Sequence, residues 1–175
     1  MDHARNLYNE SLKFIGVGGG YPIDYKRARE LTHEAALGGF PDAILAMGWF
    51  CLNGCGGAKN VSSAKYWYRR SARRGEPMAM YSLGEVAYIE KSYEAAHYWF
   101  ELARKHGHVR SLYWLGKLYW RGQGVTRDRV KALHLFEQAA HGNAYEAKRL
   151  MRFRNRRRYK PDSAQGDAPR AAVAC

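Results

Sequence analysis

Two groups of residues in this 175-residue chain have the types and spacing that binding sites use. Cys51 and Cys55 lie four residues apart, so on a helix their thiols would face the same side, as two metal ligands would. The run Gly16-Val17-Gly18-Gly19-Gly20 has the glycine density of loops that bind phosphate. A thiolate metal site and a nucleotide site are therefore the first chemistries to consider.

Neither group completes a site. A dinucleotide fingerprint would need a glycine in place of Tyr21 and a strand before the loop, where the sequence indicates a helix. A metal site needs more ligands, and no CxxC motif or histidine pair lies near the two cysteines. His106 and His108 flank a glycine at a predicted helix end, where we interpret them as exposed or hydrogen-bonded side chains. Because no nucleophile elbow, HExxH motif or catalytic carboxylate pair occurs, we predict no enzyme activity, no cofactor and no metal.

The elements that carry these residues repeat along the chain. Glycines recur nine residues apart, in the pairs Gly39 and Gly48, Gly75 and Gly84, and Gly107 and Gly116. An alanine follows sixteen residues after Gly48 and after Gly116. Self-similarity with a period of roughly 30–40 residues indicates a solenoid, in which each unit contacts mainly its neighbours.

Each repeat is predicted to contain two helices. The second glycine of each pair lies inside the first helix, where it costs roughly 1 kcal/mol relative to alanine. We predict that it allows the second helix to approach closely. The second helix begins after aligned N-cap residues, which are Asp24, Asn60, Ser92 and Asp128. It ends at glycine or asparagine, namely at Gly38-Gly39, Gly75, Gly107 and Gly142-Asn143.

The third repeat has a set of residues with a familiar order and spacing. They are Leu115-Gly116, Tyr119, Gly122-Gln123-Gly124-Val125, Asp128, Lys131-Ala132, Phe136, Ala139-Ala140 and Gly142. This pattern resembles the Sel-like repeat (SLR), a relative of the tetratricopeptide repeat, and the resemblance covers roughly Leu7 to Met151. The preceding repeat departs from the pattern because it lacks the glycine loop between its helices. The resemblance implies an adaptor or scaffold that gathers other proteins.

We predict an all-α fold, a right-handed α/α solenoid of antiparallel helix pairs, over residues 1–158. A partial unit is expected at residues 7–39, complete units at about 41–75, 77–107 and 109–142, and a capping helix at about 145–158. Residues 159–175 are predicted to be a disordered tail, because they are small, polar and rich in alanine and proline.

Composition and charge limit the function classes. The chain is 46% hydrophobic and 14% aromatic, which is enough to bury a core. No apolar run reaches the length of a membrane span, and none follows the N-terminus as in a signal peptide, so we predict a cytoplasmic protein that does not bind membranes. The net charge is +13, and basic residues concentrate after Ala147. The predicted helix at 145–158 is therefore either a polar cap or an anion-binding element.

One face of the first helices combines aromatic and charged residues at helical spacing. The resemblance to tetratricopeptide-type solenoids implies that this face lines a concave groove. The predicted partner-binding residues are Trp49, Tyr81, Glu85, Tyr88, Arg110, Tyr113, Lys117, Trp120, Arg121, Arg149, Phe153, Arg156 and Arg157. Aromatic residues and arginine are enriched at binding hot spots. The alternative is that these aromatic residues only pack on the neighbouring unit.

We predict a non-enzymatic adaptor or scaffold that binds an acidic segment of another protein in the groove. A bacterial regulatory or immunity protein would fit this description. The alternative is a nucleic-acid-binding protein that uses the basic C-terminal helix, where phosphate contacts would dominate. An enzyme is the third class, and nothing in the sequence calls for it.

Overall fold

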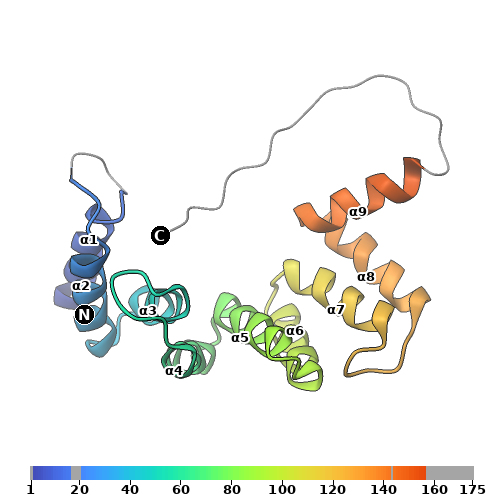
Figure 1. Ribbon diagram of the computed structural model, residues 1–175. Coiled ribbons are helices and arrows are strands. Elements are labelled where there is room, and N and C mark those ends of the chain that lie inside the picture. The colour runs from blue at the N-terminus through green and yellow to red at the C-terminus, as the bar shows by residue number, and fades with distance from the viewer. Residues whose placement is uncertain (1, 17–20, 143, 157–175) are drawn as a thin grey trace. The chain divides into compact units, whose positions relative to one another are not determined.

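The computed structural model describes residues 2–16, 21–142 and 144–156, and within them all regular structure is helical. The predicted disordered tail at 159–175 lies outside the described residues. The helices in chain order are α1 (Asp2–Lys13), α2 (Tyr25–Leu37), α3 (Pro41–Asn53), α4 (Val61–Ala72), α5 (Pro77–Ile89), α6 (Tyr93–Lys105), α7 (Arg110–Arg121), α8 (Arg129–His141) and α9 (Tyr145–Arg156) (Figure 1). The chain forms two compact units, of which the first ends at Leu83 and the second begins at Gly84, within α5.

In the first unit, α1 packs on α2, α2 on α3 and α3 on α4 (Figure 1). The buried side chains of this unit are mainly apolar, and they include Ala28, Leu31, Ala35, Ile44, Met47, Phe50, Ala64 and Tyr68. Two buried hydroxyls are satisfied within this core, because Thr32 Oγ1 donates to Ser11 Oγ at 3.0 Å and Ser11 Oγ donates to the Tyr8 carbonyl at 2.7 Å.

In the second unit, α7 packs on α6 and on α8, and α8 packs on α9. Phe100, Leu115 and Leu118 are fully buried, and the Phe100 ring stacks on Trp114 with centroids 5.6 Å apart. Ala139, Ala144 and Ala147 form a small-residue cluster between α8 and α9, against which Tyr113 is packed. Helix α7 thus packs between α6 and α8, and this packing fixes the orientation of the face of α7 that contacts neither helix.

The predicted helix N-caps are confirmed for three of the four aligned residues. Side-chain oxygens of Asp24, Asn60 and Asp128 accept hydrogen bonds from backbone N–H groups three residues on, at 3.0, 2.8 and 2.9 Å. Ser92 precedes α6 but makes no such bond. The connection before it is the short one that lacks the glycine loop, and Lys91 turns the chain there with a φ of 61°. This tight turn gives Ser92 a backbone conformation unlike that of the other three caps.

The glycines inside the first helices lie at close helix crossings, as predicted. A Cβ atom added at Gly116 would lie 2.6 Å from the Phe136 ring, and one added at Gly84 would lie 2.5 Å from the Phe100 ring. Tyr68 crowds Gly48 in the same way in the first unit. Since aromatic rings from the second helices fill these positions, the repeated glycine is required for packing.

The first and last helices differ in their bounds from the ranges predicted for them. Helix α1 begins at Asp2, before the partial unit predicted at 7–39, and its first turn is mostly polar and exposed. The capping helix predicted at 145–158 is described as α9, Tyr145–Arg156.

Candidate functional site

Four of the residues predicted to bind a partner lie together in the second unit. Tyr113, Lys117 and Arg121 recur every four residues on α7, so they share one face of that helix. Tyr88, near the C-terminal end of α5, reaches the same face. We call this set, together with Trp114 and Gln123, the Lys117 cluster.

Aromatic rings surround the ammonium group of Lys117. Its Nζ lies 3.8 Å from the ring centroid of Trp114, 4.9 Å from that of Tyr88 and 5.7 Å from that of Tyr113. The Tyr88 and Trp114 rings also meet edge to face, with centroids 4.8 Å apart. These cation–π contacts hold the ammonium at one place on the surface of α7. Burial, and then the positive charge of Arg121, lower the pKa of Lys117 from its ordinary value.

The hydroxyl of Tyr88 connects two elements of the cluster. Arg121 Nη1 donates to Tyr88 Oη at 3.0 Å, and Tyr88 Oη donates to Gln123 Oε1 at 3.4 Å. The bond from Arg121 to Tyr88 uses one of the five N–H donors of the Arg121 guanidinium. Arg121 remains exposed beyond it.

Lys117 and Arg121 have no carboxylate partner among the described residues. The opposite end of α7 differs, because Arg110 forms an ion pair with Glu146 of α9. Three positive charges on one helix face are therefore not equivalent. Arg110 is neutralised by Glu146, whereas no described carboxylate neutralises Lys117 or Arg121.

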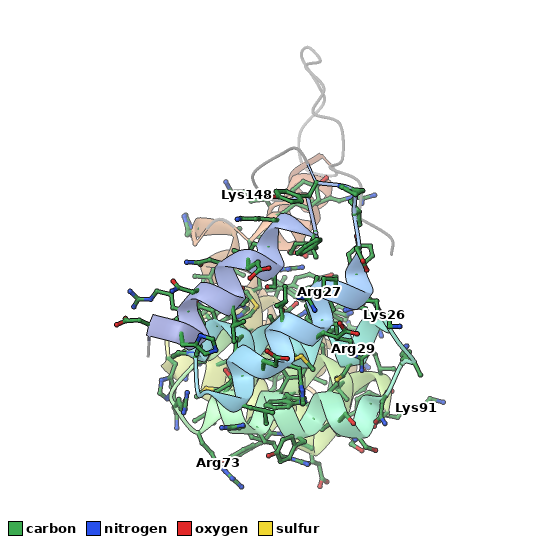
Figure 2. The ribbon with its side chains drawn as sticks, turned by 90° about the vertical axis from the view of Figure 1, so that its left-hand side faces the viewer. Lys26, Arg27, Arg29, Arg73, Lys91 and Lys148 are labelled. Atoms are coloured by element: carbon green, nitrogen blue, oxygen red, sulfur yellow. The ribbon has the colours of Figure 1, made fainter. Side chains whose placement is uncertain are left out.

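Cys51 does not belong to a metal-binding group of side chains in the part of the chain that the structure describes. Cys51 is a free, buried thiol, and Arg29 Nη2 donates to its sulfur at 3.7 Å. Lys26 and Arg27 project from the same helix as Arg29 (Figure 2). Burial raises the pKa of Cys51, and the neighbouring Arg29 only partly offsets this. No group of three or more metal-binding side chains occurs among the described residues.

Matches to known proteins place this arrangement in a family. The family model "Sel1 repeat" matches residues 12–40, 41–76, 77–108 and 109–143. The chain belongs to the Sel1 repeat family. The predicted resemblance is thereby confirmed.

Solved Sel1 repeat structures share the fold. A Sel1 repeat protein from Oxalobacter formigenes is 24% identical, with a TM-score of 0.77, and the match covers 89% of this chain and 63% of that one. A protective antigen of uropathogenic Escherichia coli with an SLR fold is 26% identical, with a TM-score of 0.76, over 88% of this chain and 34% of that one. The predicted fold class, a right-handed solenoid of antiparallel helix pairs, is confirmed.

A curated relative matches over a shorter region. The chitin synthase regulator SKT5 of Malassezia restricta is 33% identical over 73 residues, which is 42% of this chain and 5% of that protein. The chain thus spans only a small part of this relative's length. Proteins with Sel1 repeats generally act as non-catalytic scaffolds that bind other proteins. None of the described helices is long and apolar enough to cross a membrane, and the cytoplasmic location stays a prediction.

The other residues predicted to bind a partner differ in how exposed they are. Trp49 is 40% exposed and lines a pocket of about 290 Å³ in the first unit, together with Tyr8, Leu12 and Phe50. Tyr81 is only 2% exposed, so it offers almost no surface to a partner and is a core residue here. Glu85 is half-buried on α5.

The remaining predicted residues lie toward the end of the last Sel1 repeat. Trp120 is 40% exposed, and the guanidinium of Arg129 lies 5.3 Å from its ring centroid. Arg149 is exposed on α9. Phe153 and Arg156 belong to α9, but their side chains are not described, and Arg157 lies outside the described residues.

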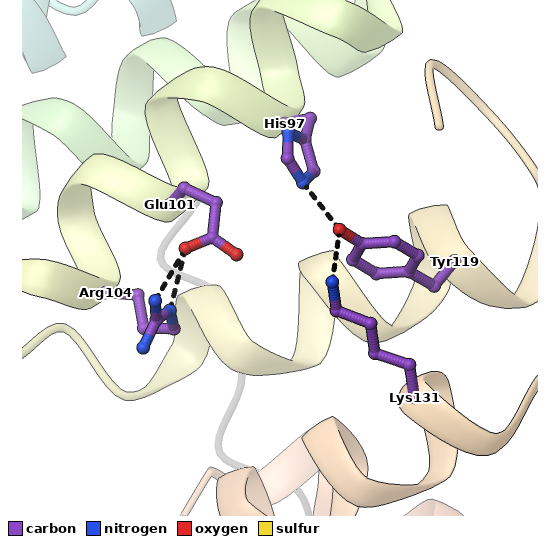
Figure 3. Close-up of polar contacts among 5 residues, drawn as sticks. All are labelled: His97, Glu101, Arg104, Tyr119 and Lys131. Atoms are coloured by element: carbon purple, nitrogen blue, oxygen red, sulfur yellow. Dashed lines mark hydrogen bonds and ion pairs between the residues drawn. The ribbon is translucent and has the colours of Figure 1, made fainter. Parts of the chain in front are cut away.

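A second polar cluster in the second unit was not predicted. Lys131 Nζ donates to Tyr119 Oη at 2.7 Å, and His97 Nε2 lies 3.2 Å from the same hydroxyl (Figure 3). The residues come from α8, α7 and α6, so this cluster ties three consecutive helices together. Burial lowers the pKa of His97, and Lys131 lowers it further, whereas Glu101 acts in the opposite direction. Glu101 itself is paired with Arg104 (Figure 3). Since its polar groups bond to one another, we assign this cluster to stability.

The Lys117 cluster also contains two residues that the sequence reasoning missed. Trp114 lies two residues before the helical glycine and is not among the residues predicted to line the groove. Gln123 lies in the glycine loop, which was interpreted only as a turn. The signal for Trp114 was its spacing of three from Lys117, since residues three apart are neighbours on a helix.

Proposed function

We propose that this protein is a non-catalytic protein-binding module that takes an acidic segment of another protein on the Lys117 cluster. The observation that carries the proposal is the pair of positive charges, Lys117 and Arg121, that no described carboxylate neutralises. Family membership supports the general role, because Sel1 repeat proteins bind other proteins.

The composition of the cluster favours an acidic peptide over a nucleic acid. A peptide can present one or two carboxylates to the two cations and an apolar group to the ring of Tyr113. A nucleic acid needs a row of phosphate contacts along its backbone. The third positive residue on this face of α7, Arg110, is already paired with Glu146, so no such row continues along the helix.

The proposal is tested by affinity capture from host extract with three matched proteins. These are the wild type, the site variant Lys117→Glu with Arg121→Glu, and a control variant Lys105→Glu with Arg127→Glu. Both variants change the net charge equally, and Lys105 and Arg127 are exposed residues that do not belong to the cluster. We expect a partner that binds the wild type and the control variant and is lost with the site variant.

Mass spectrometry and salt dependence decide between outcomes. The same set of captured proteins on all three baits would refute binding at this cluster. A captured nucleic acid whose affinity falls steeply with salt would favour the basic C-terminal region instead.

A further inference from the structure

Both cations of the Lys117 cluster contact a single tyrosine. Lys117 Nζ lies over the face of the Tyr88 ring, 4.9 Å from its centroid, and Arg121 Nη1 binds the hydroxyl of the same ring at 3.0 Å. Lys117 and Arg121 are also four residues apart on α7, so their side chains are neighbours. Both positive groups thus contact the same tyrosine before any partner arrives, and the charge of Arg121 acts on Lys117.

Holding two like charges together costs free energy, which one negative group would recover. Burial and the charge of Arg121 both disfavour the ammonium form of Lys117. A carboxylate between the two cations would replace this repulsion with two charge-assisted hydrogen bonds. Because the positions are already fixed by Tyr88 and Trp114, little side-chain freedom would be lost on binding.

We infer that the Lys117 cluster binds the carboxylate of one glutamate side chain of the partner, between Lys117 Nζ and the Arg121 guanidinium, with Tyr88 as the positioning residue. This inference rests on the proposed function and specifies its ligand group. The rings around Lys117 distinguish a side-chain carboxylate from a chain end. The methylene groups of glutamate can pack on the half-buried ring of Tyr113, whereas a terminal carboxylate would bring its own peptide N–H against this apolar ring without a partner.

The probe is a blocked single residue, N-acetylglutamate N-methylamide, which carries only the side-chain carboxylate. Binding is followed by NMR titration of the protein with ¹³C-labelled lysines, where the Lys117 signal is assigned by its loss in Lys117→Met. The comparison compounds are the glutamine analogue, N-acetylalanine as a chain end, inorganic phosphate and sodium chloride. We expect saturable shifts of the Lys117 signal with the glutamate probe and none above the chloride response with the glutamine analogue.

Variants assign the roles within the site. Arg121→Gln, followed at the Lys117 signal, should lower the affinity for the probe at least about ten-fold. Tyr88→Phe keeps the ring but removes the hydroxyl, so it should weaken binding less and should release the Arg121 side-chain NMR signal from its fixed environment. The control variants Lys105→Met and Arg127→Gln should bind the probe like the wild type.

The result separates this inference from the proposed function. If the glutamine analogue, N-acetylalanine or phosphate binds as tightly as the glutamate probe, or if Arg127→Gln weakens binding as much as Arg121→Gln, the carboxylate site is refuted. That result would leave the proposed function standing as long as the captured partner is still lost with the Lys117→Glu and Arg121→Glu variant. If that partner is retained, the proposed function fails, whatever the small probe does.

Discussion

Helices α3 and α7 occupy the same place in their repeats but present different chemistry. The residue after the helical glycine is Trp49 in α3 and Lys117 in α7. Around Trp49 the surface is a largely apolar pocket that includes Leu12, Ile15 and Phe50. Around Lys117 it is a set of three aromatic rings and two cations that have no carboxylate partner among the described residues. The comparison shows that the repeat specifies a backbone and a core, whereas what each unit can bind depends on the exposed positions.

The largest effect on stability is expected at the helical glycines, which both repeats share. Replacing Gly116 with leucine places a side chain where the Phe136 ring lies, and Gly48→Leu does the same against Tyr68. Each substitution should lower the free energy of unfolding by about 3 kcal/mol through overpacking. Urea denaturation of both variants measures this. If either variant loses less than about 1 kcal/mol of unfolding free energy, the helices at that crossing can move apart at little cost, and the packing of the two repeats differs.

A pair of residues at the start of these helices gives the second prediction. His108 and Ser111 in the second unit align with Phe40 and Ala43 in the first. Burial, and then the charge of Arg110, lower the pKa of His108 from 6.5 to about 4, and its Nδ1 lies 3.0 Å from Ser111 Oγ. As pH falls from 6.5 toward 4, the unfolded chain binds this proton before the folded one does. Stability is therefore retained above pH 6.5 and lost toward pH 4.

Because His108 is partly exposed, we expect a loss of about 1–2 kcal/mol over this range, less than the full shift would give. The double variant His108→Phe with Ser111→Ala copies the pair in the first unit and should remove this part of the pH dependence. Urea midpoints at pH 7 and pH 4 for both proteins provide the measurement. An identical pH dependence in the two proteins would rule out His108 as its source.

The N-caps give a smaller effect that tests the irregular repeat. Asn60→Ala and Asp128→Ala each remove a side-chain bond to a backbone N–H, at 2.8 and 2.9 Å, and should cost about 1 kcal/mol. Ser92→Ala removes no such bond and should change stability by less than about 0.5 kcal/mol. Thermal denaturation of the three variants compares them directly. An equal loss for Ser92→Ala would mean that its hydroxyl caps α6 in solution.

Sequence reasoning predicted the parts of this molecule that depend on local spacing. Helical periodicity was enough to place Tyr113, Lys117 and Arg121 on one face, and aligned caps and glycines gave the helix ends. It could not predict the ion pair of Arg110 with Glu146, which joins residues 36 apart in sequence. Nor could it separate Tyr81, which is buried, from Tyr88, which is half-buried seven residues later on the same helix, because burial depends on packing between helices.

The smallest effects on stability are expected for substitutions of the charged residues of α7. Arg110 is paired with Glu146, whereas Lys117 and Arg121 have no described carboxylate partner. Arg110→Gln should therefore lower the free energy of unfolding, by about 0.5–1 kcal/mol because the pair is partly exposed. Lys117→Met keeps most of the apolar stem against the rings and removes a charge that burial disfavours, so stability should stay within about 0.5 kcal/mol or rise slightly.

The same variants, measured against the captured partner, should show the opposite order. Lys117→Met should weaken partner binding about ten-fold or more, and Arg110→Gln should leave it nearly unchanged. A charge that contributes to binding but not to folding is what a recognition site requires, since its free energy is gained only when the partner supplies the opposite charge. If Lys117→Met instead destabilises the fold as much as Arg110→Gln and binds the partner normally, Lys117 is a structural residue, and the α3 pocket around Trp49 becomes the better candidate for recognition.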